Sequence, residues 1–311
     1  MRKHTTMTVP KDLDVAVHRQ VLEIADQLGI DVAYAARPIG IPHGLAHCPK
    51  LLWPGASLYK TLAAIALYRR RGDDISSPVA VDPVARHVPG GVGLSLMRDE
   101  VTLTWREIAR WMLIGSDNTA AALVLEEVGP VLMQQSAQAA GMVSTRIAPA
   151  AGTVAAAVAA RRPEVSSYGS AGQARTPDRD DQLVAYASRD LVLGSVTTAQ
   201  DQVELLAALW SGKLLTPEAT AEVTEMLGQQ IVKTRVGSAF TYPGVQVAAK
   251  SGSWGPYRHE AAVVTHRDEQ PVALCIMTES LEFERRLPSI DDGIGKMASI
   301  LVDGLRALLH R

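Results

Sequence analysis

A serine and a lysine stand three residues apart in Ser57-Leu58-Tyr59-Lys60, at the start of a strongly apolar segment. Positions i and i+3 of a helix share a face, so the Lys60 amine can reach the Ser57 hydroxyl if both lie in a first helical turn. A serine becomes an effective nucleophile beside a base, and a lysine acts as a base only when burial or a nearby cation lowers its pKa. A helix N-cap followed by a solvated lysine is the other interpretation.

A second polar cluster, Ser116-Asp117-Asn118, separates two segments with helical periodicity. Its hydroxyl can relay a proton, and its amide can hydrogen-bond a substrate carbonyl. Capping is the competing interpretation, because Ser, Asp and Asn are the residues preferred where a helix starts.

The third cluster, Lys250-Ser251-Gly252-Ser253, ends an apolar, strand-like run. It offers a cation and two hydroxyls on a strand that can pair with an extended substrate, and Gly252 lets a backbone approach closely. A strand that leaves a sheet through a glycine turn would contain the same residues.

Each cluster alone is weak, but the three in this order resemble the signature of the serine β-lactamase and penicillin-binding-protein superfamily, and class A β-lactamases most of all. The resemblance runs from about Ile30 to the C-terminus and includes Leu103-Thr104 and Thr197-Thr198-Ala199, each of which opens a helix. It implies an α/β plus all-α fold, in which a five-stranded antiparallel sheet is flanked by the terminal helices and faces a helical second lobe.

The same resemblance implies a serine hydrolase or acyltransferase that acts through an acyl-enzyme on an amide, lactam or ester of a small molecule, without a cofactor. Ser57 is expected to be acylated and Lys60 to activate it. Ser116 is expected to pass a proton to the leaving group while Lys250 keeps the site electropositive. The backbone N–H groups of Ser57 and Ser253 are expected to form the oxyanion hole.

Substrate binding is expected from residues of the second and third clusters and from one arginine: Asn118, Ser251, Gly252, Ser253 and Arg258. Asn118 would bind a side-chain amide of the substrate. Ser251 and Ser253, with Arg258, would hold a substrate carboxylate, although an arginine at the start of a strand can equally be an exposed surface residue.

The sequence departs from the resemblance in the polar stretch 161–181. Class A β-lactamases carry there a glutamate, within Glu-x-x-Leu-Asn, that activates the water which hydrolyses the acyl-enzyme, and this sequence has no such motif. Asp180 has the nearest surroundings, and Glu164 is the only glutamate of the stretch. We therefore expect acylation of Ser57 but inefficient hydrolysis of β-lactams. Trp254 is expected either to wall the substrate site or to pack on the sheet.

Hydrophobic periodicity predicts the elements that position these clusters. Helices are expected over 12–28, 58–71, 103–114, 119–128, 199–210, 217–227 and 290–309, and strands over 30–36, 245–249, 261–265 and 272–277. Strands from both ends of the chain can join in one antiparallel sheet. Residues 1–54 and 199–311 would then form the α/β sheet domain, and residues 55–198 an all-α domain that carries the nucleophile and the polar loop, with the ligand site between the two lobes.

Composition limits the partners. The chain has 311 residues, 47% of them hydrophobic, and a formal net charge of −2. No basic excess favours nucleic acid or an anionic membrane, so the expected partner is a small molecule with an acyl group, with or without a carboxylate. The N-terminal residues lack the apolar run of a secretory signal, which favours a cytoplasmic protein; a secreted protein without its leader is the alternative.

The cysteine and histidine residues give little evidence of a further functional site. Cys275 lies in an apolar run and is expected in the core, and a disulfide with Cys48 is possible but not required. His43 and His47 flank Gly44 and follow Pro42, which argues against a helical metal site, so no metal is expected.

Three alternatives to the favoured function remain open. The first is a true class A β-lactamase that uses another base for deacylation. The second is a peptidase that cleaves D-alanyl-D-alanine. The third is a ligand-binding or sensor module that is acylated or occupied without turnover, which the missing loop glutamate keeps open.

Overall fold

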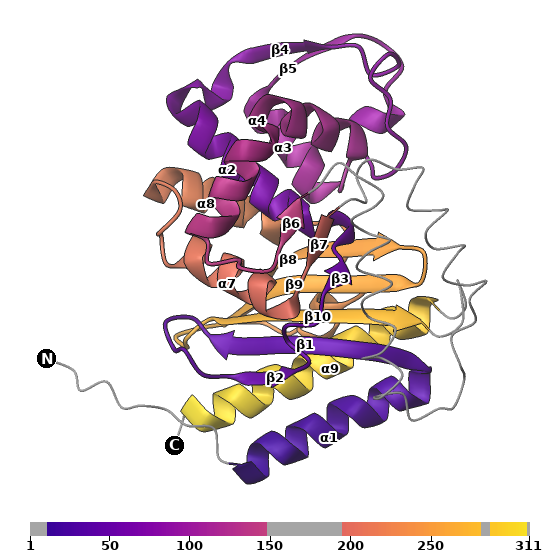
Figure 1. Cartoon of the computed structure of the whole chain (residues 1–311), viewed down its shortest axis with the longest axis vertical. Helices are drawn as coiled ribbons and strands as arrows, with labels where there is room; N and C mark the ends of the chain where they lie inside the picture. The colour runs from indigo at the N-terminus through magenta and orange to yellow at the C-terminus, as the bar shows by residue number, and fades with distance from the viewer. Residues whose placement is uncertain (1–10, 148–194, 281–286, 310–311) are drawn as a thin grey trace, which may run out of the picture.

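A computed structural model describes residues 11–147, 195–280 and 287–309. Its central sheet is five-stranded and antiparallel, as predicted, and its strand order is β2-β1-β10-β9-β8. The strands are β1 (Ile30–Pro38), β2 (Leu45–His47), β8 (Val245–Trp254), β9 (Tyr257–His266) and β10 (Val272–Ser280). Figure 1 shows that β1 and β10, from opposite ends of the chain, lie side by side, with Ile30 opposite Ser280 and Pro38 opposite Val272.

The helices α1 (Lys11–Leu28) and α9 (Leu287–Leu309) run together along one face of this sheet (Figure 1). Gly29 ends α1 in a left-handed conformation with φ 63°, as the sequence predicts. The two helices pack closely at Gly293, where a Cβ atom would lie 2.3 Å from Leu28 Cδ1. A larger residue at position 293 would therefore require the Leu28 side chain to move.

The other face of the sheet packs against α7 (Ala199–Trp210) and a 3₁₀ turn, Ala56–Leu58. All nine residues of β10 are buried. A strand covered on both faces needs apolar residues in succession rather than in alternation, which accounts for the continuous apolar run in its sequence. Cys275 lies in this strand with no exposed surface, and no disulfide joins it to Cys48.

A separate helical core joins α2 (Tyr59–Arg71), α3 (Trp105–Ile114), α4 (Asn118–Ala139) and α8 (Pro217–Gly228). Side-chain oxygens cap three of these helices: those of Thr104, Asp117 and Thr216 accept hydrogen bonds from the backbone N–H three residues on. Figure 1 places these helices beyond the β8 edge of the sheet, on the opposite side from α1 and α9. The third cluster, on β8, therefore faces the helical lobe.

Several boundaries differ from the sequence prediction. Residues 103–104 belong to β5 (Val101–Thr104), which pairs with β4 (Pro78–Val81), so α3 starts at Trp105. The fourth helix continues to Ala139 through a kink at Gly129, whose φ is 71°. Pro130 follows this kink in the first turn of the continuing segment, where a missing N–H is tolerated.

The remaining described elements are short. They are β3 (Trp53–Pro54), β6 (Arg146–Ile147) and β7 (Ser195–Thr197), which form a small sheet of order β3-β7-β6, and 3₁₀ helices at Gly72–Ser76, Leu94–Leu96 and Val236–Ala239. The division of the chain at residues 54 and 198 stays a prediction. Within the described residues, α8 shares the helical core, and α7 contributes Leu205 to that core and Val203 to the sheet core.

Within the ranges 11–147, 195–280 and 287–309, no helix combines the length and the apolar character that a membrane crossing requires.

Candidate active site

Ser57 lies in the 3₁₀ turn Ala56–Leu58, which leads directly into α2. Ala56 has a φ of 44°, in the left-handed region that non-glycine residues rarely adopt, so the turn is held by its surroundings. Neither this turn nor α2 has a side-chain N-cap. The helix-cap interpretation of Ser57 is therefore wrong, and its hydroxyl has no capping role.

Lys60, in the first turn of α2, is completely buried. Its Nζ donates to Ser116 O at 2.6 Å, to Asn118 Oδ1 at 2.7 Å and to Ser116 Oγ at 3.3 Å. An ammonium group has three donors, and three acceptors surround this one. The solvated-lysine interpretation is therefore wrong, and α2 connects the first cluster to the second.

The second cluster combines a structural residue with two that face the lysines. Asp117 is buried and caps α4, accepting from Ala120 N at 2.7 Å and from Ser95 N at 2.8 Å. The capping interpretation therefore holds for Asp117, whereas Ser116 and Asn118 accept hydrogen bonds from Lys60. Ser116 takes a left-handed conformation with φ 54°, and Asn118 Nδ2 donates to Pro89 O at 2.6 Å.

Lys250 brings the third cluster to the same hydroxyl. Its Nζ donates to Ser116 Oγ at 3.1 Å, to Gln230 Oε1 at 3.2 Å and to Ser251 O at 3.2 Å. Burial lowers the pKa of Lys250 to about 7; Glu260 opposes this change and Arg235 adds to it. Ser116 Oγ therefore lies within hydrogen-bonding distance of two buried lysines that come from different elements.

Gly252 sets the distance between β8 and the Ser57 turn. A Cβ atom at this position would lie 3.3 Å from Ala56 Cβ, Gly55 O and Leu58 Cγ. This contact is tighter than ordinary packing, so glycine is the residue that fits. The structure therefore brings all three clusters together around Ser57, Lys60, Ser116, Asn118, Lys250, Ser251, Gly252 and Ser253.

The two arginines near the third cluster are placed differently. Arg258 NH1 donates to Tyr257 O at 2.6 Å and to Gly255 O at 2.9 Å, in the connection between β8 and β9. Arg235 is only 3% exposed, and its NH2 group donates to Ser253 Oγ at 2.6 Å. The Arg235 guanidinium thus contacts the third cluster, and sequence reasoning missed this residue because it lies in no recognisable motif.

Arg235 is fixed on several sides. Its NH1 group donates to His259 O at 2.6 Å and to Gly252 O at 2.9 Å, and its Nε lies 2.8 Å from Asp291 Oδ1 of α9. A carboxylate ligand would therefore meet a guanidinium whose orientation is already set.

Sequence reasoning also missed Gln230 and Glu260, which are buried behind Lys250. Gln230 Oε1 accepts from Ser251 N at 2.5 Å, and Gln230 Nε2 donates to Glu260 Oε1 at 3.2 Å. One signal was available, because Glu260 is a charged residue directly before an apolar strand run. Nothing in the sequence connects Gln230 to it.

Trp254 packs on the sheet rather than standing free. It is 6% exposed, and its ring stacks on Tyr257 with 5.5 Å between the ring centroids. The packing interpretation is therefore supported for this residue.

The expectations for the carboxylates of the polar stretch 161–181 are not tested by the structure. Asp180, Glu164 and the rest of 161–181 lie outside the described residues.

Within the described ranges, no group of three or more His, Cys, Asp and Glu side chains lies close enough together to hold a metal ion. Burial, with a smaller effect of His18, lowers the pKa of His47 to about 4.

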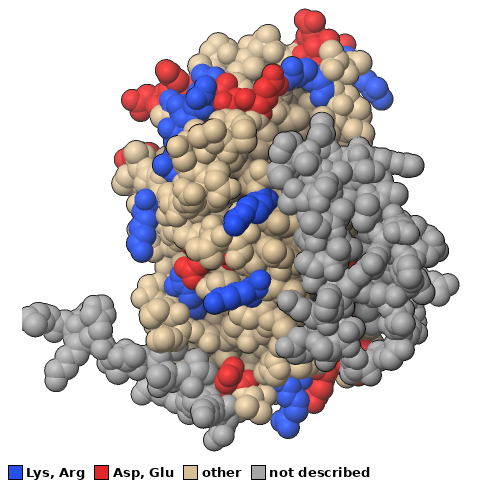
Figure 2. All heavy atoms as spheres, viewed as in Figure 1, with Lys and Arg blue, Asp and Glu red and all other residues tan. Residues whose placement is uncertain are grey.

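Charged side chains of both signs are interspersed on the face shown in Figure 2. Over the helical lobe at the top of the view, Lys and Arg side chains lie next to Asp and Glu side chains. The described part of this face has no broad patch of a single sign.

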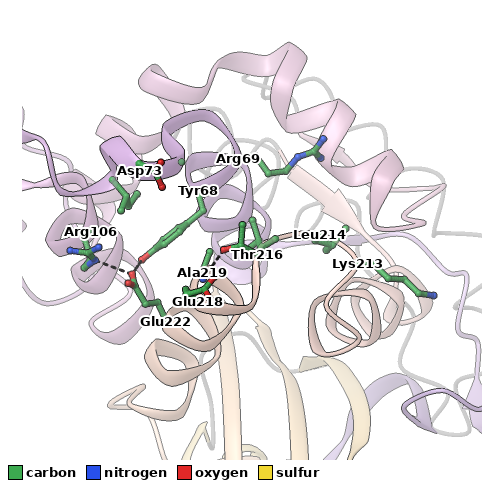
Figure 3. Close-up of a pocket in the computed structure, with 13 residues that line it drawn as sticks. Tyr68, Arg69, Asp73, Arg106, Lys213, Leu214, Thr216, Glu218, Ala219 and Glu222 are labelled. Atoms are coloured by element: carbon green, nitrogen blue, oxygen red, sulfur yellow. Dashed lines mark hydrogen bonds and ion pairs between the residues drawn. The ribbon is translucent and has the colours of Figure 1, made fainter.

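A cavity of about 820 Å³ lies at the far end of α2 from Lys60. Figure 3 shows the Tyr68 side chain crossing towards Glu222, whose Oε2 accepts from Tyr68 OH at 2.6 Å and from Arg106 Nε at 2.9 Å. Eight residues of helix, about 12 Å, separate Lys60 from Tyr68. This cavity is therefore distinct from the site around Ser57.

The fold and the three converging clusters define the class of protein. A serine at the start of a buried helix lies with two buried lysines, a second serine and an asparagine where a five-stranded sheet meets a helical lobe. The chain belongs to the β-lactamase enzyme family, whose model matches residues 20–305. This membership places it among serine hydrolases of the β-lactamase type.

Individual relatives agree on the fold and differ in role. A β-lactamase from Sphaerobacter thermophilus superposes with a TM-score of 0.72 at 18% identity, covering 96% of this chain and 98% of its own. A mutant of PBP-A, as an acyl-enzyme complex with penicillin G, superposes with a TM-score of 0.71 at 14% identity, covering 99% and 100%. The β-lactamase regulatory protein BlaB of Streptomyces cacaoi is 24% identical over 308 residues, 93% of this chain and 97% of BlaB.

Proposed function

We propose that this protein forms an acyl-enzyme at Ser57 with the amide, lactam or ester carbonyl of a small molecule. The observation that carries the proposal is the Ser116 hydroxyl, which Lys60 Nζ approaches to 3.3 Å and Lys250 Nζ to 3.1 Å. Serine and lysine groups in such a relay can move a proton from a nucleophile to a leaving group.

In the proposed acylation, Lys60 reacts as the neutral amine, having first lost a proton to solvent: Ser57 Oγ attacks the carbonyl carbon while the Ser57 proton passes to Lys60 Nζ. When the tetrahedral intermediate collapses, Ser116 Oγ donates its proton to the leaving nitrogen or oxygen, and Lys60 then returns a proton to Ser116. The net result is one proton moved from Ser57 to the leaving group, with Lys250 charged throughout. The backbone N–H groups of Ser57 and Ser253 would stabilise the oxyanion.

Substrate recognition is proposed to use the groups beside this relay. Asn118 Nδ2, which donates to Pro89 O in the free protein, would turn its donor to a substrate amide carbonyl. A substrate carboxylate would bind Ser251 and Ser253 with Arg235, because the Arg235 guanidinium already contacts Ser253 Oγ. Arg258 is a weaker candidate for this role, since its NH1 group serves two backbone carbonyls.

The test is the intact mass of the protein over time after addition of benzylpenicillin. The wild type is expected to gain the mass of the drug, and Ser57→Ala to gain none. Because Ser57 caps no helix, Ser57→Ala should change the free energy of unfolding by less than about 1 kcal/mol. Ser76→Ala, which changes an exposed serine of a different 3₁₀ helix, is the control and should react as the wild type does.

The outcomes separate the alternatives. A lasting adduct would indicate weak deacylation and would favour transfer or sensing, whereas a transient adduct with consumption of the drug would indicate a β-lactamase. An adduct that persists in Ser57→Ala would contradict the assignment of the nucleophile. A wild type that reacts with neither benzylpenicillin nor a chromogenic cephalosporin would contradict a β-lactam-reactive site, and a peptide ending in D-Ala-D-Ala would be tested next.

The similarity to BlaB favours one second candidate, a regulatory protein that is acylated or occupied without turnover. For this candidate the useful measurement is thermal stability rather than product. Saturating benzylpenicillin should raise the melting temperature of the wild type, because a ligand that binds only the folded state stabilises it. Product release at a steady rate would exclude this candidate.

A further inference from the structure

A buried carboxylate, Glu260, is connected to Lys250 through one side chain, Gln230. Glu260 has no exposed surface, and Gln230 lies between it and Lys250. Gln230 Oε1 accepts from Lys250 Nζ at 3.2 Å, while Gln230 Nε2 donates to Glu260 Oε1 at 3.2 Å. The chain of contacts therefore runs from the Ser116 hydroxyl through an ammonium and an amide to a carboxylate.

Gln230 is saturated with partners, which fixes its orientation. Its oxygen accepts from Lys250 Nζ and from Ser251 N, and its nitrogen donates to Glu260 Oε1 and to Val232 O. A flipped amide would point donors at two donors, so the opposite orientation is excluded. Gln230 thus presents its negative end to Lys250 and its positive end to Glu260.

The hydrogen bonds also indicate the charge of Glu260. Its Oε1 accepts from Gln230 Nε2, and its Oε2 accepts from Val236 N at 2.6 Å. A protonated carboxyl group needs an acceptor for its O–H, whereas both of these partners are donors. Burial raises the pKa of Glu260 above its ordinary value, although the charges of Arg235 and Lys250 and the two hydrogen bonds reduce that rise. The geometry assigns the ionised form.

We propose that Glu260, acting through Gln230, is the counter-charge that keeps Lys250 protonated while Lys250 holds the Ser116 hydroxyl, and that this pair sets the alkaline limit of acylation. The inference rests on the proposed acylation of Ser57. Neither Gln230 nor Glu260 would touch the substrate, so both are positioning residues.

Other charged groups face this network and do not replace Glu260. Arg235 is near both Lys250 and Glu260, but its charge is balanced by Asp291. Lys233 and the buried Cys275 thiol also interact electrostatically with Glu260. Lys60 is the second cation at Ser116. Glu260 is thus the anion in position to offset the charge of Lys250.

The expected effect has a definite sign. The pKa of Lys250, about 7, is far below the ordinary value of 10.5, so Lys250 is charged below that pH and loses its proton above it. Removing the negative charge in Glu260→Gln disfavours the charged lysine. The acylation rate with benzylpenicillin should fall at high pH as Lys250 loses its proton, and we call this fall the alkaline limb. In Glu260→Gln the alkaline limb should therefore move to lower pH by about one unit or more.

A double variant separates charge from structure. Glu260→Gln alone places an amide against the donors Gln230 Nε2 and Val236 N, so it also disturbs hydrogen bonding. Exchanging the two residues, as Gln230→Glu with Glu260→Gln, keeps an acceptor for Lys250 and Ser251 and returns the negative charge, at the cost of the donor to Val232 O. The exchange should bring the alkaline limb back to the wild-type pH or above it.

Glu225→Gln is the matched control, because it removes an exposed carboxylate from the end of α8 and should leave the limb in place. An unmoved limb in Glu260→Gln, or an exchange variant that folds without restoring it, would overturn the proposal. A second measurement does not depend on activity. In protein labelled with ¹³Cε-lysine, NMR follows the Lys250 signal as the pH changes, and this signal is assigned by its loss in Lys250→Arg. If the wild type does not react with benzylpenicillin, the proposed acyl-enzyme is contradicted. If Glu260→Gln leaves the titration of Lys250 unchanged, the proposed role of Glu260 is contradicted.

Discussion

Two lysine side chains converge on one serine hydroxyl in this site, and their mutual repulsion has a chemical consequence. Both Lys60 and Lys250 are buried, and both donate to Ser116 Oγ. Two positive charges this close in a poorly solvated site disfavour each other. One of them is therefore disposed to give up its proton, which is the condition for a lysine to act as a base.

At the residue scale, the arginine that recognises a carboxylate can be identified by mutation. Arg235→Lys keeps the charge but loses the planar fork that contacts Ser253 and Asp291. It should weaken the apparent affinity for benzylpenicillin roughly tenfold and leave that for the methyl ester of the drug almost unchanged. The measurement is the concentration dependence of the acylation rate.

Arg258→Lys is the control for this prediction, because the described partners of Arg258 NH1 are the carbonyls of Gly255 and Tyr257. A larger loss in Arg258→Lys than in Arg235→Lys would assign the carboxylate to Arg258, as the sequence prediction has it.

At the scale of elements, periodicity located most helices and the strands of the central sheet. The helices over 199–210 and 217–227 match α7 and α8 almost residue for residue. The misses have physical causes. Residues 101–104 form β5 because a partner strand, Pro78–Val81, lies beside them, and no local pattern reveals that partner.

The same limit applies to the site. Residues within a motif, such as Ser57 and Lys60, were predicted because the three clusters in order resemble a family signature, whereas Arg235 and Gln230 lie in no motif. These two reach the site through contacts with β8 and β9 that depend on how distant segments pack. Local sequence patterns carry no information about such contacts unless a motif marks both partners.

The contact between β8 and the Ser57 turn can be tested with one methyl group. In Gly252→Ala, the new Cβ would lie 3.3 Å from Ala56 Cβ, Gly55 O and Leu58 Cγ, so the turn must shift by a few tenths of an ångström. Since small misplacements of reacting groups are costly, acylation by benzylpenicillin should slow by about tenfold. The melting temperature should change little by comparison.

Gly237→Ala serves as its control, because a Cβ there makes only ordinary contacts of 3.5 Å and 3.7 Å with the Lys233 side chain. Equal rates in Gly252→Ala and the wild type would show that this contact does not position Ser57.

At the scale of the whole molecule, two helices span the distance between the site and the cavity of Figure 3. One end of α2 carries Lys60, and the other carries Tyr68 in the cavity wall. The N-terminal part of α8 contributes Glu222 to the same wall, and Gln230 follows its C-terminus. The contacts of Glu222 with Tyr68 and Arg106 therefore join α8 to α2 and α3.

This junction should respond to pH. Burial opposes ionisation of Glu222, but hydrogen bonds from Tyr68 and Arg106 outweigh it and hold the pKa of Glu222 below its ordinary value of 4.5. A carboxyl group with a lowered pKa stabilises the fold above its unfolded pKa, and this contribution is lost as the pH falls through the folded value.

Glu222→Gln should therefore lower the free energy of unfolding by about 1–2 kcal/mol near neutral pH and by clearly less below a pH of about 4. Urea denaturation at the two pH values measures this difference. Glu218→Gln, exposed on the same helix, should behave as the wild type does. A difference that stays constant with pH would show that the ionised form of Glu222 contributes nothing.

The pairing of β1 with β10 also has a consequence for how the chain is made. Synthesis proceeds from the N-terminus, so the apolar residues of β1 leave the ribosome long before β10 exists to cover them. Closing so long a loop is slow compared with forming the local helices of the helical lobe. The nascent chain must therefore carry an unpaired edge of β1 until β10 has been synthesised, and during that interval this edge is exposed to aggregation.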